Sequence, residues 1–467
     1  MMVLQEIKRI YFLAIGGTAM GSLAALLKQK GYEVYGSDEN VYPPMSDFLH
    51  EQQIPVISGF RVENLTPPPD LVIVGNVISR GNVEIEEILD RRIPYLSLPD
   101  AVREFLIRGK QSIVVTGTHG KTTTTSLLAW LFTSAGRDPG FLIGGIPKNF
   151  GRGFQLGNGK EFIIEGDEYD SAFFDKVAKF LRYMPDIGII NAVEYDHADI
   201  YASLDEIKTA FRRFVNLIPR RGMLVINGDD PNVRDVASRA FCPVVTFGMN
   251  AENDWYPAAW RCGLQGVEFS VLKKGELWGE ARLGLAGTHN IRNALACIAV
   301  ADACGIDKQT ILAALASFSG VKRRLERLGE VHGMEVYDDF GHHPTAVKET
   351  LAALRAQHPN RRIWALYEPR SATSRRNVFQ NEFVDAFQDA DVILAAPVHR
   401  PDKAPADQLF SSAKLAEDLR RRGKEARYLN IDEMVAFILD HGREGDLIVT
   451  FSNGPFGGIH EKLLQRS

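Results

Sequence analysis

The sequence predicts an α/β protein made of three consecutive units, each with a mainly parallel sheet. The chain has 467 residues, and a prior of about one domain per ~150 residues predicts about three domains. Short apolar runs alternate with helical stretches almost throughout, which is the pattern of strands joined by crossover helices. We expect the units to span residues 1–108, 109–320 and 321–467.

Composition and charge exclude several classes of protein. The 54 basic and 59 acidic residues give a formal charge of −5, which argues against a nucleic-acid-binding protein that relies on a basic surface. No apolar run approaches the ~18–20 residues of a membrane span. The first ten residues enter a strand at once and lack the features of a signal peptide. We expect a cytoplasmic protein without membrane or nucleic-acid partners.

The four cysteines have neither disulfide-framework nor zinc-site spacing. No Cys-x-x-Cys pair occurs, so we expect small buried thiols in a reducing compartment. They are Cys242, Cys262, Cys297 and Cys304.

The first unit begins with a Rossmann-like pattern. Residues 9–15 form an apolar run, residues 16–21 contain Gly16, Gly17 and Gly21, and a helix should follow to about residue 30. A second strand at residues 32–36 leads to Asp38, an acidic residue about 20 positions after the turn. The glycine spacing differs from GxGxxG, so the residues leave two alternatives open, a nucleotide site and a plain strand-to-helix turn.

The second unit contains the most informative motif of the chain. A buried strand at residues 113–115 runs into the loop TGTHGKTT, and a helix should occupy residues 123–134. A strand, a glycine-rich loop and a helix N-terminus together bind polyphosphate, because free backbone N–H groups and the helix dipole face the anion. Lys121 would reach the terminal phosphates, and Thr122 would bind Mg²⁺. The first glycine of GxxxxGK[ST] is replaced by Val115, so the loop is a compact variant.

Acidic residues follow two other strands of this unit. The strand Glu161–Glu165 precedes Asp167 and Glu168, and residues 187–191 precede Glu194, Asp196 and His197. Ligands of open α/β sheets gather at such strand ends, so we predict metal or phosphate binding here. The alternatives are a solvated acidic turn and a structural histidine.

The remaining elements complete the α/β pattern. Residues 250–286 should form an antiparallel addition, and residues 291–304 a helix of small residues. Further strands are expected at residues 71–75, 222–227, 244–247, 333–337, 362–367, 390–395 and 446–451.

Asn290 and Asn293 lie three residues apart at the start of the predicted helix 291–304, and so on one face. Two amides there could recognise the edge of a base or could cap the helix. The residues alone favour the cap.

Basic residues and histidines begin the third unit. Arg323 and Arg324 could clamp phosphate, because guanidinium groups match its oxygens. Asp339, His342 and His343 follow the strand 335–337 in a loop. Charged residues on a solvated face are the alternative for both groups.

Six motifs in order along the chain resemble the Mur ligases, ATP-dependent amide-forming enzymes of peptidoglycan synthesis. They are TGTHGKTTT, EGDEYD, EYDH, GTHNIRN, RR and DDFGHHP. The resemblance implies an N-terminal Rossmann-like UDP-binding domain, a central P-loop ATPase domain and a C-terminal Rossmann-like domain.

The resemblance also implies site residues. For catalysis it implies Lys121, His197, Arg324, Asp339, His342 and His343. For ATP it implies Gly117, Thr118, His119, Gly120, Lys121, Thr122, Thr123, Asn290, Asn293, Arg324 and Asp339. For Mg²⁺ it implies Thr122, Glu165 and His197, and Lys208 is the only lysine close after His197 that could complete a carbamoylated metal shell. For the UDP-sugar it implies Gly16, Gly17, Thr18, Ala19, Met20, Gly21, Asp38, Asn76, Ser79, Arg80 and Asn82, and for the peptide Arg370 and Ser371.

Within the family, the segments 144–150 and 452–460 resemble a branch that attaches an intact tripeptide, L-Ala-γ-D-Glu-meso-diaminopimelate, to UDP-N-acetylmuramate in recycling. The resemblance implies an acyl-phosphate intermediate and a monomer or weak homo-oligomer. Three alternatives stay open: a ligase that adds L-alanine, a nicotinamide dehydrogenase built on residues 9–38, and an ATP-binding protein without catalysis. The complete GKTT loop speaks against the dehydrogenase.

Overall fold

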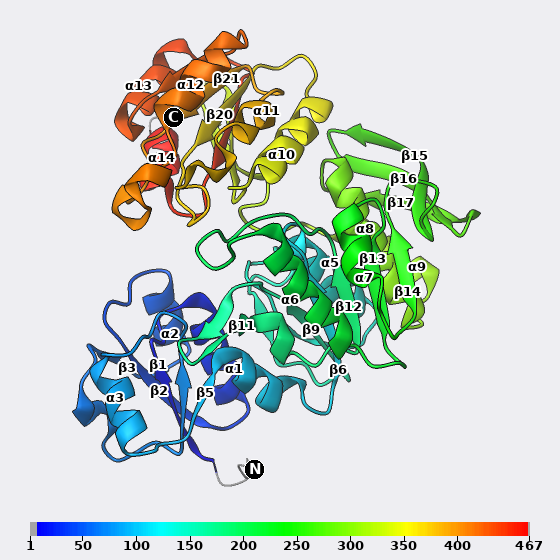
Figure 1. The fold of residues 1–467 in the computed structure, drawn as a ribbon. Helices are drawn as coiled ribbons and strands as arrows, with labels where there is room; N and C mark the ends of the chain where they lie inside the picture. Colours follow the sequence, from blue (N-terminus) through cyan, green and yellow to red (C-terminus); the bar gives the residue numbers. More distant parts are fainter. Residues whose placement is uncertain (1–6, 466–467) are drawn as a thin grey trace.

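The computed structural model has three α/β units that follow one another along the chain, blue, green and yellow to red in Figure 1. It describes residues 7–465; the first six residues of the expected N-terminal strand region, and residues 466–467, lie outside this range. The predicted fold class is confirmed, while the boundaries at residues 108 and 320 stay predictions. Within the described range, no helix is long and apolar enough to cross a membrane.

The first unit has a five-stranded parallel sheet in the order β3-β2-β1-β4-β5. Its strands are β1 Arg9–Leu13, β2 Glu33–Asp38, β3 Val56–Ser58, β4 Leu71–Val74 and β5 Tyr95–Ser97. Its α-helices are α1 Thr18–Gln29, α2 Met45–Glu51, α3 Val83–Asp90 and α4 Leu98–Val102. The chain reverses at the central strand β1, so the loops after β1, β2 and β4 meet at one edge, where open α/β sheets bind ligands.

The second unit has a ten-stranded sheet in the order β17-β16-β15-β14-β13-β12-β6-β9-β7-β8. Its strands are β6 Gln111–Thr116, β7 Gly140–Leu142, β8 Phe154–Gln155, β9 Glu161–Glu165, β12 Ile187–Ile190, β13 Met223–Asn227, β14 Val244–Phe247, β15 Trp255–Gly263, β16 Gly266–Lys273 and β17 Glu276–Leu283, beside the hairpin β10 Asp170–Ala172 and β11 Asp175–Ala178. Its α-helices are α5 Lys121–Ser134, α6 Leu204–Leu217, α7 Pro231–Ala237, α8 Thr288–Ala303 and α9 Lys308–Ser317.

The strand before the phosphate loop lies in the middle of this sheet. Parallel partners β12 and β9 flank β6, and Ile113, Val114 and Val115 are completely buried. A parallel strand covered on both faces needs a continuous apolar run, which the sequence supplies. The predicted antiparallel addition is confirmed as β15, β16 and β17.

The third unit has a six-stranded sheet in the order β18-β19-β23-β20-β21-β22, parallel except for β18. Its strands are β18 Glu326–Val331, β19 Met334–Asp339, β20 Ile363–Tyr367, β21 Val392–Ala395, β22 Glu425–Tyr428 and β23 Leu447–Phe451. Its α-helices are α10 Pro344–Gln357, α11 Glu382–Ala386, α12 Ser412–Arg421, α13 Ile431–His441 and α14 Ile459–Leu464. All four cysteines are free, and Cys242 and Cys297 are buried as expected, whereas Cys262 near the end of β15 and Cys304 at the end of α8 are only half-buried, contrary to the expectation.

A buried carboxylate ties the first unit together. Glu84 of α3 is completely buried and accepts hydrogen bonds from Tyr11 Oη at 2.9 Å and Ser37 Oγ at 2.7 Å. It also accepts from Arg61 N at 2.9 Å and Asn64 Nδ2 at 2.6 Å. One side chain therefore satisfies donors from two strands and a loop.

We predict that Glu84→Ala lowers the free energy of unfolding by at least ~3 kcal/mol, because several buried donors lose their acceptor at once. Thermal unfolding measures the change. Glu86→Ala is the matched control, since Glu86 pairs with Arg80 at the surface and its loss should change stability far less. Equal effects of the two substitutions would contradict the prediction.

Candidate active site

The phosphate loop packs too closely against its neighbours to carry side chains at two positions. Gly117 and Gly120 have φ of 126° and 78°. A Cβ at Gly117 would lie 2.8 Å from Ala192 N, and one at Gly120 would lie 2.7 Å from Asn293 Oδ1. The helix α5 begins at Lys121, two residues earlier than predicted, and no side chain caps it. Its first N–H groups are therefore free for an anion.

Lys121 is held inside the loop by a buried ion pair. Its Nζ donates to Gly117 O at 2.8 Å and to Glu168 Oε2 at 2.8 Å. Burial alone would lower the pKa of Lys121, but the carboxylates of Glu168, Asp167 and Glu165 outweigh it and raise that pKa above its usual value. The lysine is thus a fixed positive charge beside the free helix N-terminus.

Carboxylates, a hydroxyl and an imidazole gather at the strand ends, as predicted. Thr122 Oγ1 donates to Glu165 Oε1 at 2.8 Å. Ligand atoms of Asp167, Glu168 and His197 all lie within 4.8 Å of one another. Glu168 Oε1 is buried without a hydrogen-bond partner among the described residues. Oxygen donors with an unsatisfied buried carboxylate oxygen suit a hard divalent cation.

Lys208 does not belong to this cluster. Its Nζ lies 3.1 Å from Asp235 Oδ2, so it pairs between α6 and α7. Glu168 joins Lys121 and His197, since His197 Nε2 lies 3.8 Å from Glu168 Oε2. The sequence motifs did not predict Glu168 as a ligand.

The third unit reaches the phosphate loop through one of the two consecutive arginines. Arg324 Nη2 donates to Thr122 Oγ1 at 3.2 Å. Arg323 turns away, with Nε donating to Asp338 Oδ2 at 2.8 Å and Nη2 donating to Ser452 O at 2.7 Å. The predicted pair is therefore split into one arginine at the site and one that braces its own unit.

Asp339 fixes the segment that carries Arg324. Its carboxylate accepts from Leu325 N at 2.8 Å and Gly341 N at 2.7 Å. Burial raises the pKa of Asp339, although Arg324 opposes the rise. Asp339 thus acts on Arg324 by holding the backbone on both sides of the turn.

His342 and His343 lie where α10 meets the second unit. His343 is the N-cap of α10, and its Nδ1 accepts from Thr345 N at 3.3 Å while its Nε2 donates to Tyr195 O at 3.2 Å. Burial and the nearby His119 lower the pKa of His343 to about 4. Burial also lowers the pKa of His342, whose Nε2 lies 4.0 Å from Asp196 Oδ2. Both imidazoles are therefore neutral at neutral pH.

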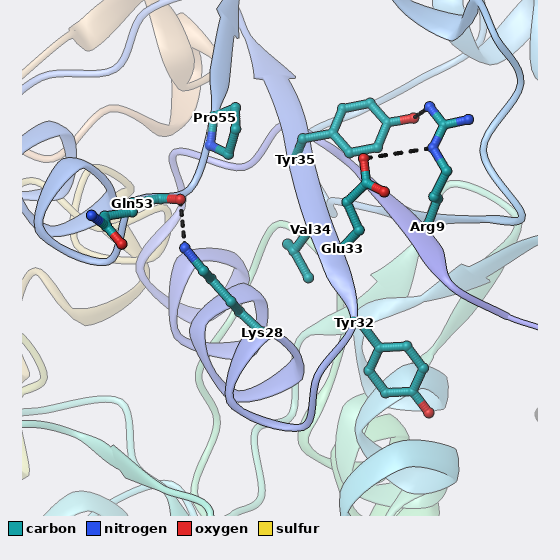
Figure 2. Close-up of a pocket in the computed structure, with 8 residues that line it drawn as sticks. All are labelled: Arg9, Lys28, Tyr32, Glu33, Val34, Tyr35, Gln53 and Pro55. Carbon is teal, nitrogen blue, oxygen red and sulfur yellow. Dashed lines mark hydrogen bonds and ion pairs between the residues drawn. The ribbon is translucent and has the colours of Figure 1, made fainter.

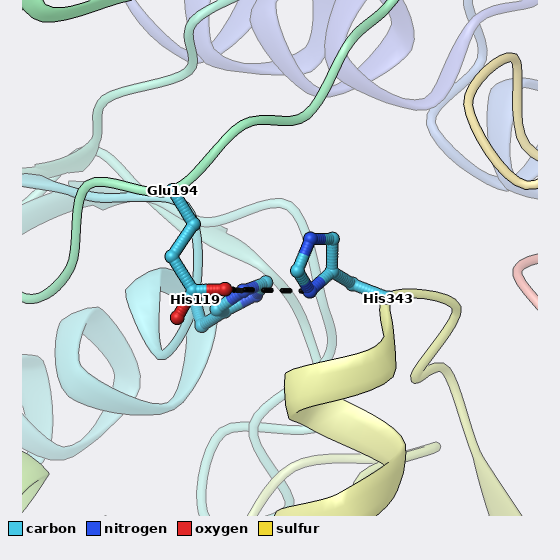
Figure 3. Close-up of side chains that lie close together, drawn as sticks. All are labelled: His119, Glu194 and His343. Atoms are coloured by element: carbon cyan, nitrogen blue, oxygen red, sulfur yellow. Dashed lines mark hydrogen bonds and ion pairs between the residues drawn. The ribbon is translucent and has the colours of Figure 1, made fainter. Parts of the chain in front are cut away.

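His343 also belongs to a cluster with His119 and Glu194 (Figure 3). Glu194 Oε2 lies 3.4 Å from His119 Nε2 and 3.6 Å from His343 Nδ1, and it accepts from Thr345 Oγ1 at 2.7 Å. Burial would raise the pKa of Glu194, but His119, His343 and the Thr345 hydroxyl lower it to about 2.

Asn290 and Asn293 do not cap α8, so the preference for a cap is wrong. The N-cap is Gly287, and no side chain caps this helix. Asn293 Nδ2 donates to Asn290 Oδ1 at 3.1 Å, and Asn293 Oδ1 accepts from Thr124 Oγ1 at 3.1 Å. Asn293 lines a cavity of about 390 Å³ beside the phosphate loop, and His119, Asn191, Asp230 and Glu349 line it too.

The predicted UDP-sugar residues gather at the ligand-binding edge of the first sheet. Residues 16–19 follow β1, and Gly16 N donates to Asp38 Oδ2 at 2.8 Å. Met20 and Gly21 are buried, where a Cβ at Gly21 would lie 2.6 Å from Met45 Cε.

The loop after β4 supplies the other predicted UDP-sugar residues. Asn76 and Ser79 are exposed. Arg80 pairs with Glu86 at 2.8 Å, and Asn82 caps α3 by accepting from Glu84 N and Ile85 N.

A second hollow, of about 410 Å³, lies at the opposite edge of this sheet (Figure 2). Its polar groups bind one another: Arg9 Nη2 donates to Tyr35 Oη at 3.0 Å, and Lys28 Nζ donates to Gln53 O at 2.6 Å. No predicted site residue lines it.

The loop after β20 carries two basic residues of interest, Arg370, which was predicted as a peptide contact, and Arg375, which was not. Arg370 packs on Gly454, where a Cβ would lie 2.0 Å from Arg370 Nε. Partial burial and the charges of Arg370 and Arg400 lower the pKa of Arg375. His399 lies beside them, and its pKa is lowered by burial and by Arg370. Ser371 is buried, and its Oγ donates a hydrogen bond to Ser374 Oγ, so Ser371 stabilises the conformation of the loop.

This loop docks on the turn that carries His197. Thr373 Oγ1 donates to Asp196 Oδ1 at 2.7 Å, and Arg376 Nη1 donates to Ala198 O at 2.6 Å. The basic groups therefore lie beside the acidic cluster at the phosphate loop.

Comparisons with known proteins agree with this three-unit architecture. Residues 9–110 match the Mur ligase family catalytic domain, residues 115–301 the Mur ligase middle domain, and residues 323–454 the Mur ligase glutamate ligase domain. The chain is 40% identical over 458 residues to UDP-N-acetylmuramate–L-alanyl-γ-D-glutamyl-meso-2,6-diaminoheptandioate ligase of Escherichia coli (strain K12), covering 98% of this chain and 97% of that protein.

Solved structures of two related enzymes are also similar over 98% of this chain and 98% of each structure. The murein peptide ligase of Psychrobacter arcticus is 35% identical, with a TM-score of 0.73. The UDP-N-acetylmuramate–alanine ligase of Thermotoga maritima is 26% identical, with a TM-score of 0.80. The overall fold therefore does not separate a tripeptide ligase from an alanine ligase.

A P-loop unit between two Rossmann-like units, with Lys121 and carboxylates at its centre, defines an ATP-dependent carbon–nitrogen ligase. The chain belongs to the Mur ligase family.

We predict that the Glu194 contacts make the folded protein acid-sensitive. The folded pKa of about 2 lies below the ordinary value of about 4.3, so this stabilisation is complete above about pH 5 and is lost as the pH falls toward 2. Thermal midpoints measured from pH 7 to pH 3 should fall less steeply for Glu194→Gln than for the unsubstituted protein. Glu349→Gln is the control on the same cavity, and a slope unchanged by Glu194→Gln would refute the prediction.

Proposed function

We propose that this protein joins the amino group of L-Ala-γ-D-Glu-meso-diaminopimelate to the lactyl carboxylate of UDP-N-acetylmuramate, with ATP converted to ADP and phosphate. The reaction would serve peptidoglycan recycling in the cytoplasm. The name of the E. coli relative describes this pair of substrates, and its 40% identity over nearly the whole chain supports the proposal.

ATP would bind with its phosphates on the loop 117–123 and its adenosine in the 390 Å³ cavity. The free N–H groups at the start of α5 and the Lys121 ammonium would face the phosphates. Asn293 would present its amide to the base from the wall of the cavity. Displacing Lys121 from Glu168 would free both groups for the nucleotide and its metal.

Mg²⁺ fits the residues at this site. Thr122 with Glu165 would hold one ion, and Glu168 with His197 would hold a second. When bound, these ions would neutralise the charge that builds up on the transferred phosphoryl group.

The reaction would proceed in two transfers. A lactyl carboxylate oxygen attacks the γ-phosphorus, and the bond from that phosphorus to the β–γ bridging oxygen breaks. ADP is the leaving group, and the product of this first transfer is an acyl phosphate. Lys121 and Arg324 would hold the γ-phosphate in line and stabilise its charge. The peptide amine then attacks the acyl carbon, inorganic phosphate leaves, and the amine loses a proton.

A neutral imidazole can take this proton. His342 is neutral and lies at the contact between the second and third units, 4.0 Å from Asp196, which would stabilise its charged form. His343 is less suited, because both of its ring nitrogens are already used by Thr345 N and Tyr195 O.

The observation that favours a tripeptide over L-alanine is the group of cations beside the acidic cluster. Arg370, Arg375 and Arg400 lie together with the carboxylates of Glu368 and Asp402, while the lowered pKa of His399 leaves that imidazole neutral at neutral pH. Crowded like charges are unfavourable unless an anion joins them. The tripeptide carries three free carboxylates and alanine one, so only the tripeptide offers these arginines carboxylates distant from its reacting amine.

The test measures phosphate release from ATP in the presence of Mg²⁺ and UDP-N-acetylmuramate. The tripeptide and L-alanine are offered separately, and the products are identified by mass spectrometry. We expect turnover with the tripeptide only. Turnover with alanine alone would replace this proposal with the alanine ligase, which the close superposition on the T. maritima enzyme keeps as the second candidate.

The variant Arg375→Gln tests whether these arginines select the tripeptide over L-alanine. We expect the KM for the tripeptide to rise about 10-fold or more, as a lost charge-assisted contact would cause, while the KM for UDP-N-acetylmuramate stays unchanged. Arg427→Gln is the control, because Arg427 lies on β22, the edge strand of the third unit's sheet. Equal rises in both KM values would contradict a role in peptide selection.

A further inference from the structure

The cluster of His119, Glu194 and His343 has the composition of a transition-metal site and no role in the proposed reaction that needs all three members. Each residue comes from a different segment: His119 from the phosphate loop, Glu194 from the chain after β12, and His343 from the start of α10 (Figure 3). The three ligand atoms lie within 4.8 Å of one another.

The spacing matches a tetrahedral ion. Bonds from zinc to nitrogen or oxygen are about 2.0–2.2 Å long, so ligand atoms around tetrahedral zinc lie ~3.4 Å apart. Glu194 Oε2 lies 3.4 Å from His119 Nε2 and 3.6 Å from His343 Nδ1. Two edges of the coordination polyhedron therefore already have the required length.

Neighbouring groups orient two of the ligands as they do in known metal sites. His343 Nε2 donates to Tyr195 O, which places the proton on Nε2, and the lone pair of Nδ1, which accepts a long hydrogen bond from Thr345 N at 3.3 Å, would turn to the ion on binding. Thr345 Oγ1 donates to Glu194 Oε2 at 2.7 Å and fixes the carboxylate. His119 and Glu194 also line the 390 Å³ cavity, so a fourth position would open to water.

The donor set separates this cluster from the one at Lys121. Two imidazoles and one carboxylate favour Zn²⁺ and similar ions, whereas Asp167, Glu168 and His197 offer two carboxylates and one imidazole, which suit Mg²⁺ better.

We propose that His119, Glu194 and His343 bind one zinc-class divalent ion that bridges the second and third units. The ion would tie α10 of the third unit to the phosphate loop. The proposed adenosine cavity is lined by both units, with Thr345 and Glu349 from the third, so an ion that holds the units together would slow nucleotide exchange and turnover.

Cobalt(II) tests the site directly, because tetrahedrally coordinated Co²⁺ absorbs visible light strongly. Addition of Zn²⁺ should then displace the bound Co²⁺ and remove the absorption. The full chain is titrated with Co²⁺ in excess Mg²⁺, which occupies the carboxylate-rich cluster. We expect one equivalent of tetrahedral Co²⁺, and at least ~10-fold weaker binding in Glu194→Gln and in His343→Asn. Asparagine is chosen because it can still cap α10.

His197→Asn and Glu349→Gln are the matched controls, and both should keep the cobalt absorption. Loss of the absorption in His197→Asn but not in His343→Asn would overturn the proposal and move the ion to the Lys121 cluster. Absence of tetrahedral absorption in the unsubstituted protein would also overturn it. Thermal unfolding of each variant establishes that it is folded, and Zn²⁺ should raise the midpoint only where His343 and Glu194 are intact.

A second measurement examines the consequence for activity. The zinc concentration that halves turnover should rise at least ~10-fold in Glu194→Gln, in step with the weaker binding. Cobalt binding does not depend on which amine the enzyme uses, so failure of this site and failure of the proposed reaction are distinguishable. Cobalt binding with zinc-insensitive turnover would overturn the inhibitory role.

Discussion

The close packing of the phosphate loop against β12 and α8 is the constraint on which the rest of the site depends. Gly117 and Gly120 have no room for a Cβ, because the backbone at Ala192 and the amide of Asn293 lie too near. This packing brings the loop to the end of β12 and leaves the start of α5 uncapped. Lys121 then turns back on Gly117 O and meets Glu168. The proposed phosphate and metal binding, and the contact with the third unit, all depend on this one arrangement.

The third unit completes the site through a small number of polar contacts. Arg324 reaches Thr122, and Thr373 reaches Asp196, so the start of α5 and the acidic turn after β12 each have a partner across the boundary. Polar contacts of this kind can be broken and remade during turnover. An acyl phosphate reacts with water as well as with an amine. The same contacts that position the reacting groups would therefore also keep solvent away from them.

The sequence predicts those parts of the site that lie close together along the chain. The loop with Lys121 and Thr122, and the strand ending at Glu165, follow from local pattern, because a buried strand must be apolar and a phosphate loop must contain glycine. Residues that act across long separations are harder to predict. Glu168 lies 47 residues from its partner Lys121, and Thr345 lies 151 residues from Glu194. The expected cap was wrong because both amides have buried partners: Asn290 donates to Ala286 O and accepts from Asn293, and Asn293 accepts from Thr124 Oγ1. Arg375 and His399 were missed because their meaning comes from the neighbouring cations, not from any motif.

In the proposed mechanism, the phosphate loop and the third unit together drive transfer of the γ-phosphoryl group to a substrate carboxylate. The most direct measurement follows an isotope. UDP-N-acetylmuramate labelled with ¹⁸O in its lactyl carboxylate is turned over with ATP and the tripeptide, and the released phosphate is analysed by mass spectrometry. The mechanism predicts one ¹⁸O atom in each phosphate, because the carboxylate oxygen that attacks phosphorus leaves with it when the amide forms. Unlabelled phosphate formed together with labelled amide product would contradict the account.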